Sequence, residues 1–529
     1  MADPRAELVL HGGLVLTQDP GQPRAQGVAV AAGRIVCAGT DAEVLGLAGP
    51  HARRIDLGGR TLLPGFNDAH AHLWKMGHLL TGLVDLRGCR SLQTLGEAVG
   101  AFAAPLPATA WVVGRGFNEV LMAERRRPNA VELDRAAGGR PCFLTRTCGH
   151  LGVASTRALA LARIGDDTPN PPGGVIVRDD RGRATGELQE TAMGLVSSLP
   201  PEPTAAELER MVLAAMRHQL SLGITSSSEA GLTPQQLDVY RALDSRNALP
   251  LRVNAMALRR PVGGTQTFPL PQRHDSPFLR IDSIKLLADG GLSGATAALR
   301  VCYRHCEDHG VLRLTCDEIV ELCREPHEAG MRIGIHAIGD AAIDAVLDAY
   351  DALGASRHGV RHRVEHFGLP HPEHLRRAAT MGVIAVPQTI FLTELGVNFR
   401  RYLPDSLLGR SYPLREMLDR GLTVALSSDT PVVADDAPLS GIQAAVTRCD
   451  AEGEPLAPEQ AIAVQEALAA YTLGGAIASG DDVNRGSLAP GKWADMTVLN
   501  GNPLATPAER LSALRADLTL VGGSVVYER

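Results

Sequence analysis

The chain has 529 residues, 45% of them hydrophobic, so it can bury a large core, and one large domain with a smaller one is expected. Its net charge of −7, without a long basic run, argues against nucleic acid or an anionic membrane as a partner, and its 4% aromatic content argues against a platform that stacks nucleic-acid bases. Nine irregularly spaced cysteines, a polar start and the absence of a run of about 20 apolar residues predict a cytoplasmic protein with reduced thiols, no signal peptide and no membrane span.

The two ends of the chain are rich in predicted strands. Short apolar or alternating runs, separated by glycine-containing turns, recur over residues 8–36 and again over 495–499 and 518–527. Neither end has enough strands for a sandwich alone. We therefore expect residues 1–61 and 480–529 to pack together as one small discontinuous β-sandwich domain.

The first motif with chemical content is the pentapeptide 68–72, Asp-Ala-His-Ala-His, which follows the apolar run 62–66. Side chains two apart on a strand point the same way, so His70 and His72 aim two imidazoles into one volume. A metal ion requires this of its first two ligands. Two histidines at this spacing also occur by chance, so the pattern gains weight only from the segments downstream.

Four later segments have one form, a short apolar β-rich run that ends in a residue of a metal-ligand type: Lys285, His336, His366 and Asp429. After His336 the period changes to that of a helix, with apolar side chains at 343, 346, 347 and 350, and a second amphipathic helix is predicted over 207–222. Strands that alternate with helices over this length predict an α/β fold with a parallel sheet, a (β/α)8 TIM barrel over residues 62–479.

In such a barrel the carboxyl ends of the strands meet at one mouth. We assign residues 110–113 and 224–227 to strands 2 and 3 and residues 382–387 to strand 7, so that the four segments above become strands 4, 5, 6 and 8. Six ligand-type residues then converge on the mouth: His70, His72, Lys285, His336, His366 and Asp429. An insertion at about 169–198, between strands 2 and 3, is predicted to be a lid or a plain surface hairpin.

These motifs resemble the amidohydrolase superfamily and, within it, the branch that is similar to N-substituted formamide deformylases (amidohydrolase 3). The resemblance covers nearly the whole chain and is specific for the family but not for the substrate. It is carried by residues 63–72, 284–290, 335–344, 361–366, 428–432, 471–472 and 486–495.

The resemblance implies that the six converging residues bind one or two divalent metals, with Zn²⁺ expected first and Mn²⁺ or Fe²⁺ as alternatives. A protonated lysine cannot bind a cation, so Lys285 is expected to take up CO2 and become a carbamate that bridges two metals. The alternative is an ordinary ion pair between Lys285 and Asp289. A small-molecule substrate is the expected partner, and the superfamily makes a homodimer plausible.

The expected reaction is hydrolysis of an amide, N-acyl or N-formyl C–N bond. A metal lowers the pKa of bound water to roughly 7 and polarises the carbonyl, and Asp429 acts as general base and then general acid. Lys285 and His336 complete the predicted catalytic set. The acidic residues nearest to the ligands, as candidate partners for the histidines, are Asp68, Asp289, Asp340 and Glu365.

Two alternatives stay open at this point. The same metal site could serve a cyclic amide, carbamate or ester hydrolase, or a non-hydrolytic lyase or isomerase. A metal-free barrel that acts as a binding protein would be indicated by the loss of ligands, and all six positions are intact.

Other polar residues are candidates for the substrate side of the mouth, namely His150, Glu119 and Asp289, each with a structural role as the alternative. Residues 302–309 hold two cysteines and two histidines. A structural zinc commonly draws its four ligands from two separate clusters, so we interpret this tight cluster as a plain loop or a substrate contact rather than as a metal site.

Overall fold

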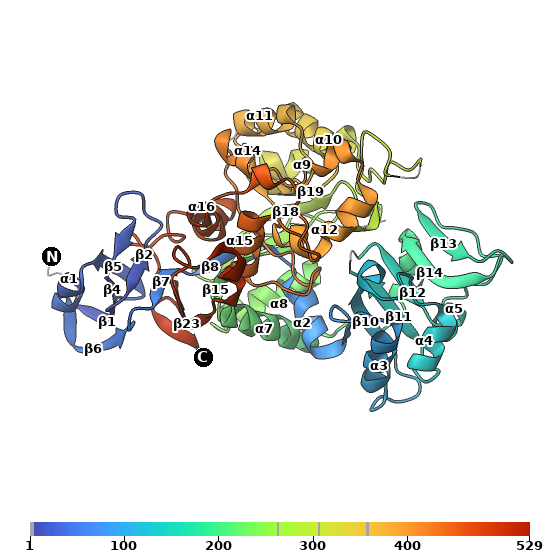
Figure 1. The fold of residues 1–529 in the computed structure, drawn as a ribbon, viewed down its shortest axis with the longest axis horizontal. Coiled ribbons are helices and arrows are strands. Elements are labelled where there is room, and N and C mark those ends of the chain that lie inside the picture. The colour runs from blue at the N-terminus through green and yellow to red at the C-terminus, as the bar shows by residue number, and fades with distance from the viewer. Residues whose placement is uncertain (1–4, 148, 262–263, 305–306, 356–358) are drawn as a thin grey trace.

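The computed structural model describes residues 5–147, 149–261, 264–304, 307–355 and 359–529, and the fold is mixed α/β. Its centre is a parallel, nearly closed barrel sheet (Figure 1). The strands of this sheet are, in spatial order, β21 (Ile384–Val386), β20 (Arg363–His366), β19 (Arg332–Ala337), β18 (Leu279–Leu287), β16 (Arg252–Leu258), β15 (Ile224–Leu232) and β8 (Phe66–Ala71). A short strand, β17 (His274–Asp275), pairs with β18 from outside this order.

Residues 423–428 fill the gap between the first and last strands of this sheet. Val424 forms a parallel bridge with Ala385 of β21. At the other side, the N–H of Asp429 donates to the carbonyl oxygen of His70 in β8 over 2.8 Å. The segment predicted as strand 8 therefore holds Asp429 directly beside the first histidine.

The prediction that residues 110–113 form barrel strand 2 is wrong. That segment leads into β10 (Val112–Phe117), which belongs to a different sheet, and β15 and β16 take the second and third barrel positions. The missed strand, β16, is buried along nearly its whole length. It ends without a metal-ligand type, so the pattern that identified the other strands gave no signal there.

A second sheet lies on the opposite side of the barrel from the N-terminal strands (Figure 1). Its order is β13 (Gly174–Arg178), β14 (Ala184–Glu190), β12 (Leu151–Ala154), β11 (Cys142–Arg146), β10 and β9 (Val84–Asp85). Three helices accompany it in sequence, α3 (Leu92–Ala103), α4 (Ala130–Ala136) and α5 (Thr156–Leu161). The predicted insertion at 169–198 contributes β13 and β14 to this sheet, so it is one part of a larger unit.

The two ends of the chain build two further sheets. One has the order β5 (Arg34–Gly39), β4 (Gly27–Ala31), β1 (Ala6–His11) and β6 (Ala48–Asp56). The other has the order β24 (Ser524–Glu528), β23 (Ala516–Val521), β22 (Met496–Leu499), β7 (Thr61–Pro64), β2 (Leu14–Leu16) and β3 (Arg24–Ala25). The antiparallel pair of β7 and β22 joins the two ends, and one buried apolar cluster draws on both sheets.

Both predicted helices are confirmed. α7 (Ala205–Ser221) begins at a capping box of Thr204 and Glu207, and α10 (Asp340–Ala352) buries the apolar stripe read from the sequence. The other helices of the barrel region include α2 (Leu73–Gly82), α8 (Pro234–Ser245), α9 (Cys316–Glu328), α11 (Pro372–Met381), α12 (Ile390–Tyr402), α14 (Leu414–Asp419), α15 (Pro438–Thr447) and α16 (Val464–Ala469). Among the described residues, every helix is too short or too polar to cross a bilayer.

Candidate metal centre

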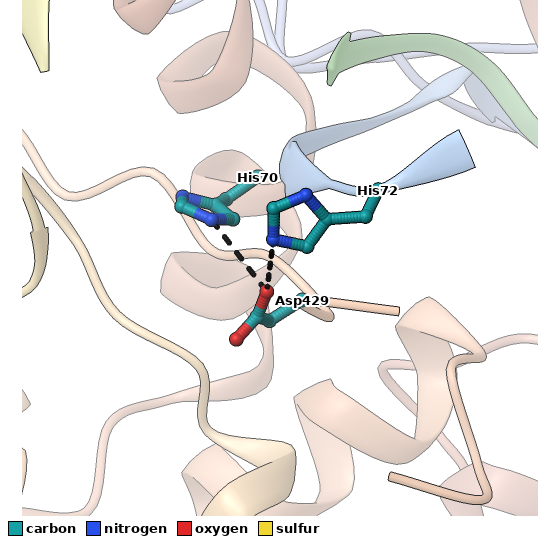
Figure 2. Close-up of side chains that lie close together, drawn as sticks. All are labelled: His70, His72 and Asp429. Atoms are coloured by element: carbon teal, nitrogen blue, oxygen red, sulfur yellow. Dashed lines mark ion pairs between the residues drawn. The ribbon is translucent and has the colours of Figure 1, made fainter. Parts of the chain in front are cut away.

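Three of the predicted ligands form a compact cluster at the barrel mouth (Figure 2). His70, His72 and Asp429 each offer a ligand atom, and these atoms lie within 4.8 Å of one another. Oδ1 of Asp429 is 3.5 Å from Nε2 of His70 and 3.3 Å from Nε2 of His72. In Figure 2 the carboxylate points toward both rings, so the three donors face one point.

The remaining predicted ligands adjoin this cluster. The ring of His366 lies 5.0 Å from that of His70 and 4.3 Å from that of His336, measured between centroids. All six predicted metal residues, Lys285 and Asp429 among them, line one cavity of about 860 Å³. The structure therefore brings the whole predicted set to one place.

The buried carboxylate of Glu365 orients the ring of His70. Its Nδ1 lies 2.5 Å from Oε2 of Glu365, and Arg363 donates to both oxygens of that carboxylate over 2.7 and 2.8 Å. A carboxylate can only accept, so Nδ1 carries the proton and Nε2 keeps its lone pair for a metal.

The other two strand-end histidines are oriented in the same way. Nδ1 of His366 lies 2.6 Å from Oε1 of Gln388, and Nε2 of His336 lies 2.8 Å from the carbonyl oxygen of Gly290. Asp289 is also within 3.2 Å of that His336 nitrogen. Each ring thus has one nitrogen fixed by an acceptor and the other left for a metal.

Of the four acidic candidates, Glu365 and Asp289 contact the rings of predicted ligands, whereas Asp68 reaches only the backbone N–H of His70, at 3.2 Å. Asp68 accepts hydrogen bonds from the hydroxyl of Ser428 (2.5 Å) and its N–H (3.0 Å), which ties β8 to the segment before Asp429. Asp340 faces His371 instead, at 2.9 Å.

Electrostatics keep the four histidines neutral. Burial lowers the pKa of His72 to about 4 and that of His366 to about 3, and it holds the pKa values of His70 and His336 well below their ordinary value. For Asp429, burial raises the pKa, but the interactions with the surrounding histidines outweigh it and leave the carboxyl below its usual range. Four neutral imidazoles and one carboxylate are the donor set that Zn²⁺ and similar cations favour.

Lys285 is the unusual member of the cluster. Its Nζ is buried and has no hydrogen-bond partner among the described residues. The alternative ion pair with Asp289 is not formed, because that carboxylate accepts from the backbone N–H groups of Ala298, Ile338 and Gly339. Burial lowers the pKa of Lys285 to about 8. An orphaned amine at this place fits a lysine that is modified to become a metal ligand.

Two of the candidate ligands have a strained backbone. His366 has φ +70° and Asp429 has φ +56°, both in the left-handed region. Such conformations cost free energy in residues other than glycine and cluster at functional sites. The strain sits at the ends of the sixth and eighth barrel strands, where it aims both side chains at the mouth.

The second sheet supplies one wall of the cavity. Arg115, His150 and Glu190 line it from that side, and Arg313 lines it from the loop after β18. Arg313 donates to Glu190 over 2.8 Å and lies 2.7 Å from Nδ1 of His150. The network links the second sheet to the barrel, and it brings His150 to the cavity.

Glu119 is not among the residues that line the cavity. Its carboxylate accepts hydrogen bonds from Arg146 at 2.8 Å and Arg127 at 3.3 Å, within the unit of the second sheet. Asp289 is likewise behind the lining, where it contacts His336. These positions favour the structural alternative for both residues.

The cysteine–histidine cluster can be followed only in part. Sγ of Cys302 lies 3.2 Å from Nε2 of His309, while His305 and Cys306 lie outside the described residues. Among the described residues, the group that could hold a metal ion is that of the barrel mouth.

Several residues that line the cavity or orient its histidines were missed by the sequence reasoning. Gln388 follows the predicted strand 7 directly, so a polar residue at a strand end was an available signal. Lys75 lies one helical turn after His72, which was a weaker one. Glu190 and Arg313 come from segments that only the fold brings to the mouth.

A smaller cavity of about 50 Å³ adjoins the metal centre. His336, His366 and Asp429 form its polar edge, and its other walls are mostly apolar, with Leu292, Leu395, Phe391, Phe399 and Tyr412 among them. The centre therefore faces one large cavity that holds several charged side chains and one small cavity that is mostly apolar.

Comparison with known proteins gives a consistent result. The family model described as "Amidohydrolase family" matches residues 53–527. The N-substituted formamide deformylase of Arthrobacter pascens is 31% identical, over 99% of this chain and 98% of the relative. The putative amidohydrolase YtcJ of Bacillus subtilis is 29% identical, over 98% and 99% of the two chains. In fold, the chain is similar to a metal-dependent hydrolase from Pyrococcus horikoshii, with a TM-score of 0.76 at 24% identity over 95% and 99% of the chains.

Proposed function

The chain belongs to the amidohydrolase family and is a hydrolase of C–N bonds, and from this premise we propose that it removes a small acyl group from an N-substituted amide. N-substituted formamides are the first substrate class to consider, since a formamide deformylase is a relative over the full length. The observation that carries the proposal is that all six predicted metal residues line one cavity.

One or two divalent metals, Zn²⁺ first, are assigned to the nitrogens of the four histidines, to Asp429 and to a modified Lys285. The free imidazole nitrogens and the strained backbone at His366 and Asp429 support this assignment. When bound, a divalent cation acidifies water and polarises the acyl oxygen.

The modification assigned to Lys285 is carboxylation. The neutral Nζ attacks the carbon of CO2, an N–C bond forms, and one amine proton leaves to solvent, so that an anionic carbamate replaces the ammonium. This step is supported by the buried Nζ, which has no hydrogen-bond partner among the described residues. A carbamate would place two oxygen acceptors where the amine makes no hydrogen bond.

Asp429 is assigned the proton transfers. Its carboxylate is ionised at neutral pH and lies at the lip of both cavities. It can accept a proton from the attacking water and return it to the leaving nitrogen. The return is required because an amide anion is a very poor leaving group.

The two cavities suggest how the substrate lies. A cavity of about 50 Å³ holds only a few non-hydrogen atoms, so it suits a formyl or similarly small acyl group. The amine portion then occupies the cavity of about 860 Å³. This arrangement favours a small acyl group with a variable amine.

The test combines composition with activity. Metal analysis and the intact mass of the native protein report the metals per chain and any mass of CO2 on Lys285. Release of butylamine is then measured from the N-butyl amides of formic, acetic and butyric acid. We expect kcat/KM to fall in that order. Failure of the metal-loaded protein to release amine from any of the three would overturn the proposed reaction.

A further inference from the structure

Lysine is rare in this chain, and its placement is uneven. Of 52 basic residues only three are lysines, Lys75, Lys285 and Lys492, and the rest are arginines. Lys75 and Lys285 both line the large cavity. Lys492 instead donates to the backbone carbonyls of Asp482 and Arg485. A chain that elsewhere uses arginine for positive charge thus keeps a compact ammonium at Lys75, a group with different geometry and hydration.

Lys75 lies on the first turn of α2, which begins directly after the ligand His72. No carboxylate of the described residues lies within 4.0 Å of its ammonium. Oε2 of the buried Glu229 accepts from the N–H of Leu73 (2.5 Å) and the hydroxyl of Tyr240 (3.0 Å), and neither of its oxygens forms an ion pair with Lys75. The ring of Trp74 is 5.8 Å away, at the outer limit of a cation–π contact.

Charges of both signs act on Lys75. Its pKa is lowered to about 8, first by burial and next by the charge of Arg115, while the charges of Asp429 and Glu229 act in the opposite direction. Elsewhere in the cavity the guanidinium of Arg313 is already neutralised by Glu190. Lys75 and Arg115 line the same cavity and the charge of Arg115 acts on Lys75, so an anion that enters the cavity on this side can meet two basic groups.

We propose that the substrate carries a carboxylate on its amine portion and that Lys75, with Arg115 beside it, binds this carboxylate. The inference rests on the proposed amide hydrolysis and narrows its substrate class. The amine portion is indicated because Lys75 and Arg115 line the large cavity and are absent from the lining of the small one. Since Lys75 is one helical turn from His72, the carboxylate lies close to the scissile bond, as in an N-formyl amino acid.

The experiment uses two probes of nearly equal shape, N-formylglycine and its neutral amide N-formylglycinamide. Their kcat/KM values are measured with the metal-loaded wild type, Lys75→Met and Arg210→Met. Arg210 is the matched control, because it lies on α7 with a side chain that is 71% exposed. Circular dichroism and metal content establish that each variant is folded and loaded.

We expect the wild type to prefer N-formylglycine by about tenfold or more, the effect of one charged hydrogen bond. In Lys75→Met the preference should fall to near one, mainly through KM. Arg210→Met should keep it. A preference near or below one in the wild type, or the same preference in Lys75→Met, would overturn the proposal.

Calorimetric binding of the same two probes separates this inference from the proposed reaction. If the metal-loaded enzyme hydrolyses neither probe, the proposed amide hydrolysis is wrong for both probes, whatever the binding experiment shows. Tighter binding of N-formylglycine to the wild type, lost in Lys75→Met, still supports a carboxylate site. Equal binding of both probes to the wild type overturns it.

Discussion

One buried histidine ends β20 and another lies directly before its first residue, and only the first has the arrangement expected of a metal ligand. At the mouth, His366 gives Nδ1 to Gln388 and turns its other nitrogen to the cavity. At the opposite end, Nε2 of His362 bonds to His327 over 2.9 Å, and its Nδ1 accepts from the N–H of Ile333. Both nitrogens of His362 are therefore occupied. A buried histidine indicates a ligand only when one ring nitrogen is fixed by an acceptor and the other faces a cavity.

Among variants at the mouth and at the opposite end of the barrel, Asp429→Asn, at the mouth, is expected to have the largest effect on kcat. The amide is nearly isosteric but cannot take up a proton, so kcat should fall by about a hundredfold or more. Steady-state kinetics with an N-formyl amine measure this. A variant that keeps more than about a tenth of the wild-type kcat would remove Asp429 from proton transfer.

Lys285→Ala should remove the bridging ligand of the proposed metal centre. Without the amine no carbamate forms, so we expect the loss of one metal equivalent and of the mass of one CO2. Inductively coupled plasma and intact-mass spectrometry read these out, with Lys75→Met as the control that removes the other cavity lysine. Unchanged metal content would rule out the bridging carbamate.

A smaller effect is expected for Gln388→Leu, which removes only the acceptor that orients His366. Partners of this kind are commonly worth about 10- to 100-fold in metal affinity. Competition with a chromophoric chelator gives the affinity of the variant and of the wild type. An unchanged affinity would show that the strand alone fixes the His366 ring.

Much of the site could be predicted from the sequence because most of the strands that supply it end in a residue of a metal-ligand type. His70, His336, His366 and Asp429 each close a β-rich run, and a parallel barrel must bring such residues together. What escaped prediction lacks that local signature. β16 ends without a residue of a metal-ligand type, so it was left out, residues 110–113 were counted as strand 2, and β15 was placed third instead of second.

The cavity wall was harder to predict than the centre. Glu190 closes β14 in the second sheet, and Arg313 lies in a loop of the barrel, more than a hundred residues away in sequence. Their hydrogen bond depends on how the two sheets are placed, and no local period encodes that. Glu119 shows the same limit, since its neighbour in sequence, Asn118, gives no hint that both face Arg146.

The smallest and most selective effect is expected at His362, directly before β20, where a substitution should lower stability without changing the site. His362→Leu removes one hydrogen-bond partner of His327 and an acceptor for the N–H of Ile333, both in the buried core. We expect the free energy of unfolding to fall by about 1–3 kcal/mol, the usual cost of an unsatisfied buried polar group. Because His362 contacts none of the mouth ligands, metal content and kcat/KM should stay at the wild-type level. Urea denaturation and metal analysis of the same preparation measure both quantities. Loss of metal in His362→Leu would mean that the two ends of β20 are coupled. The pair of His327 and His362 would then hold β20 in register in addition to stabilising the core.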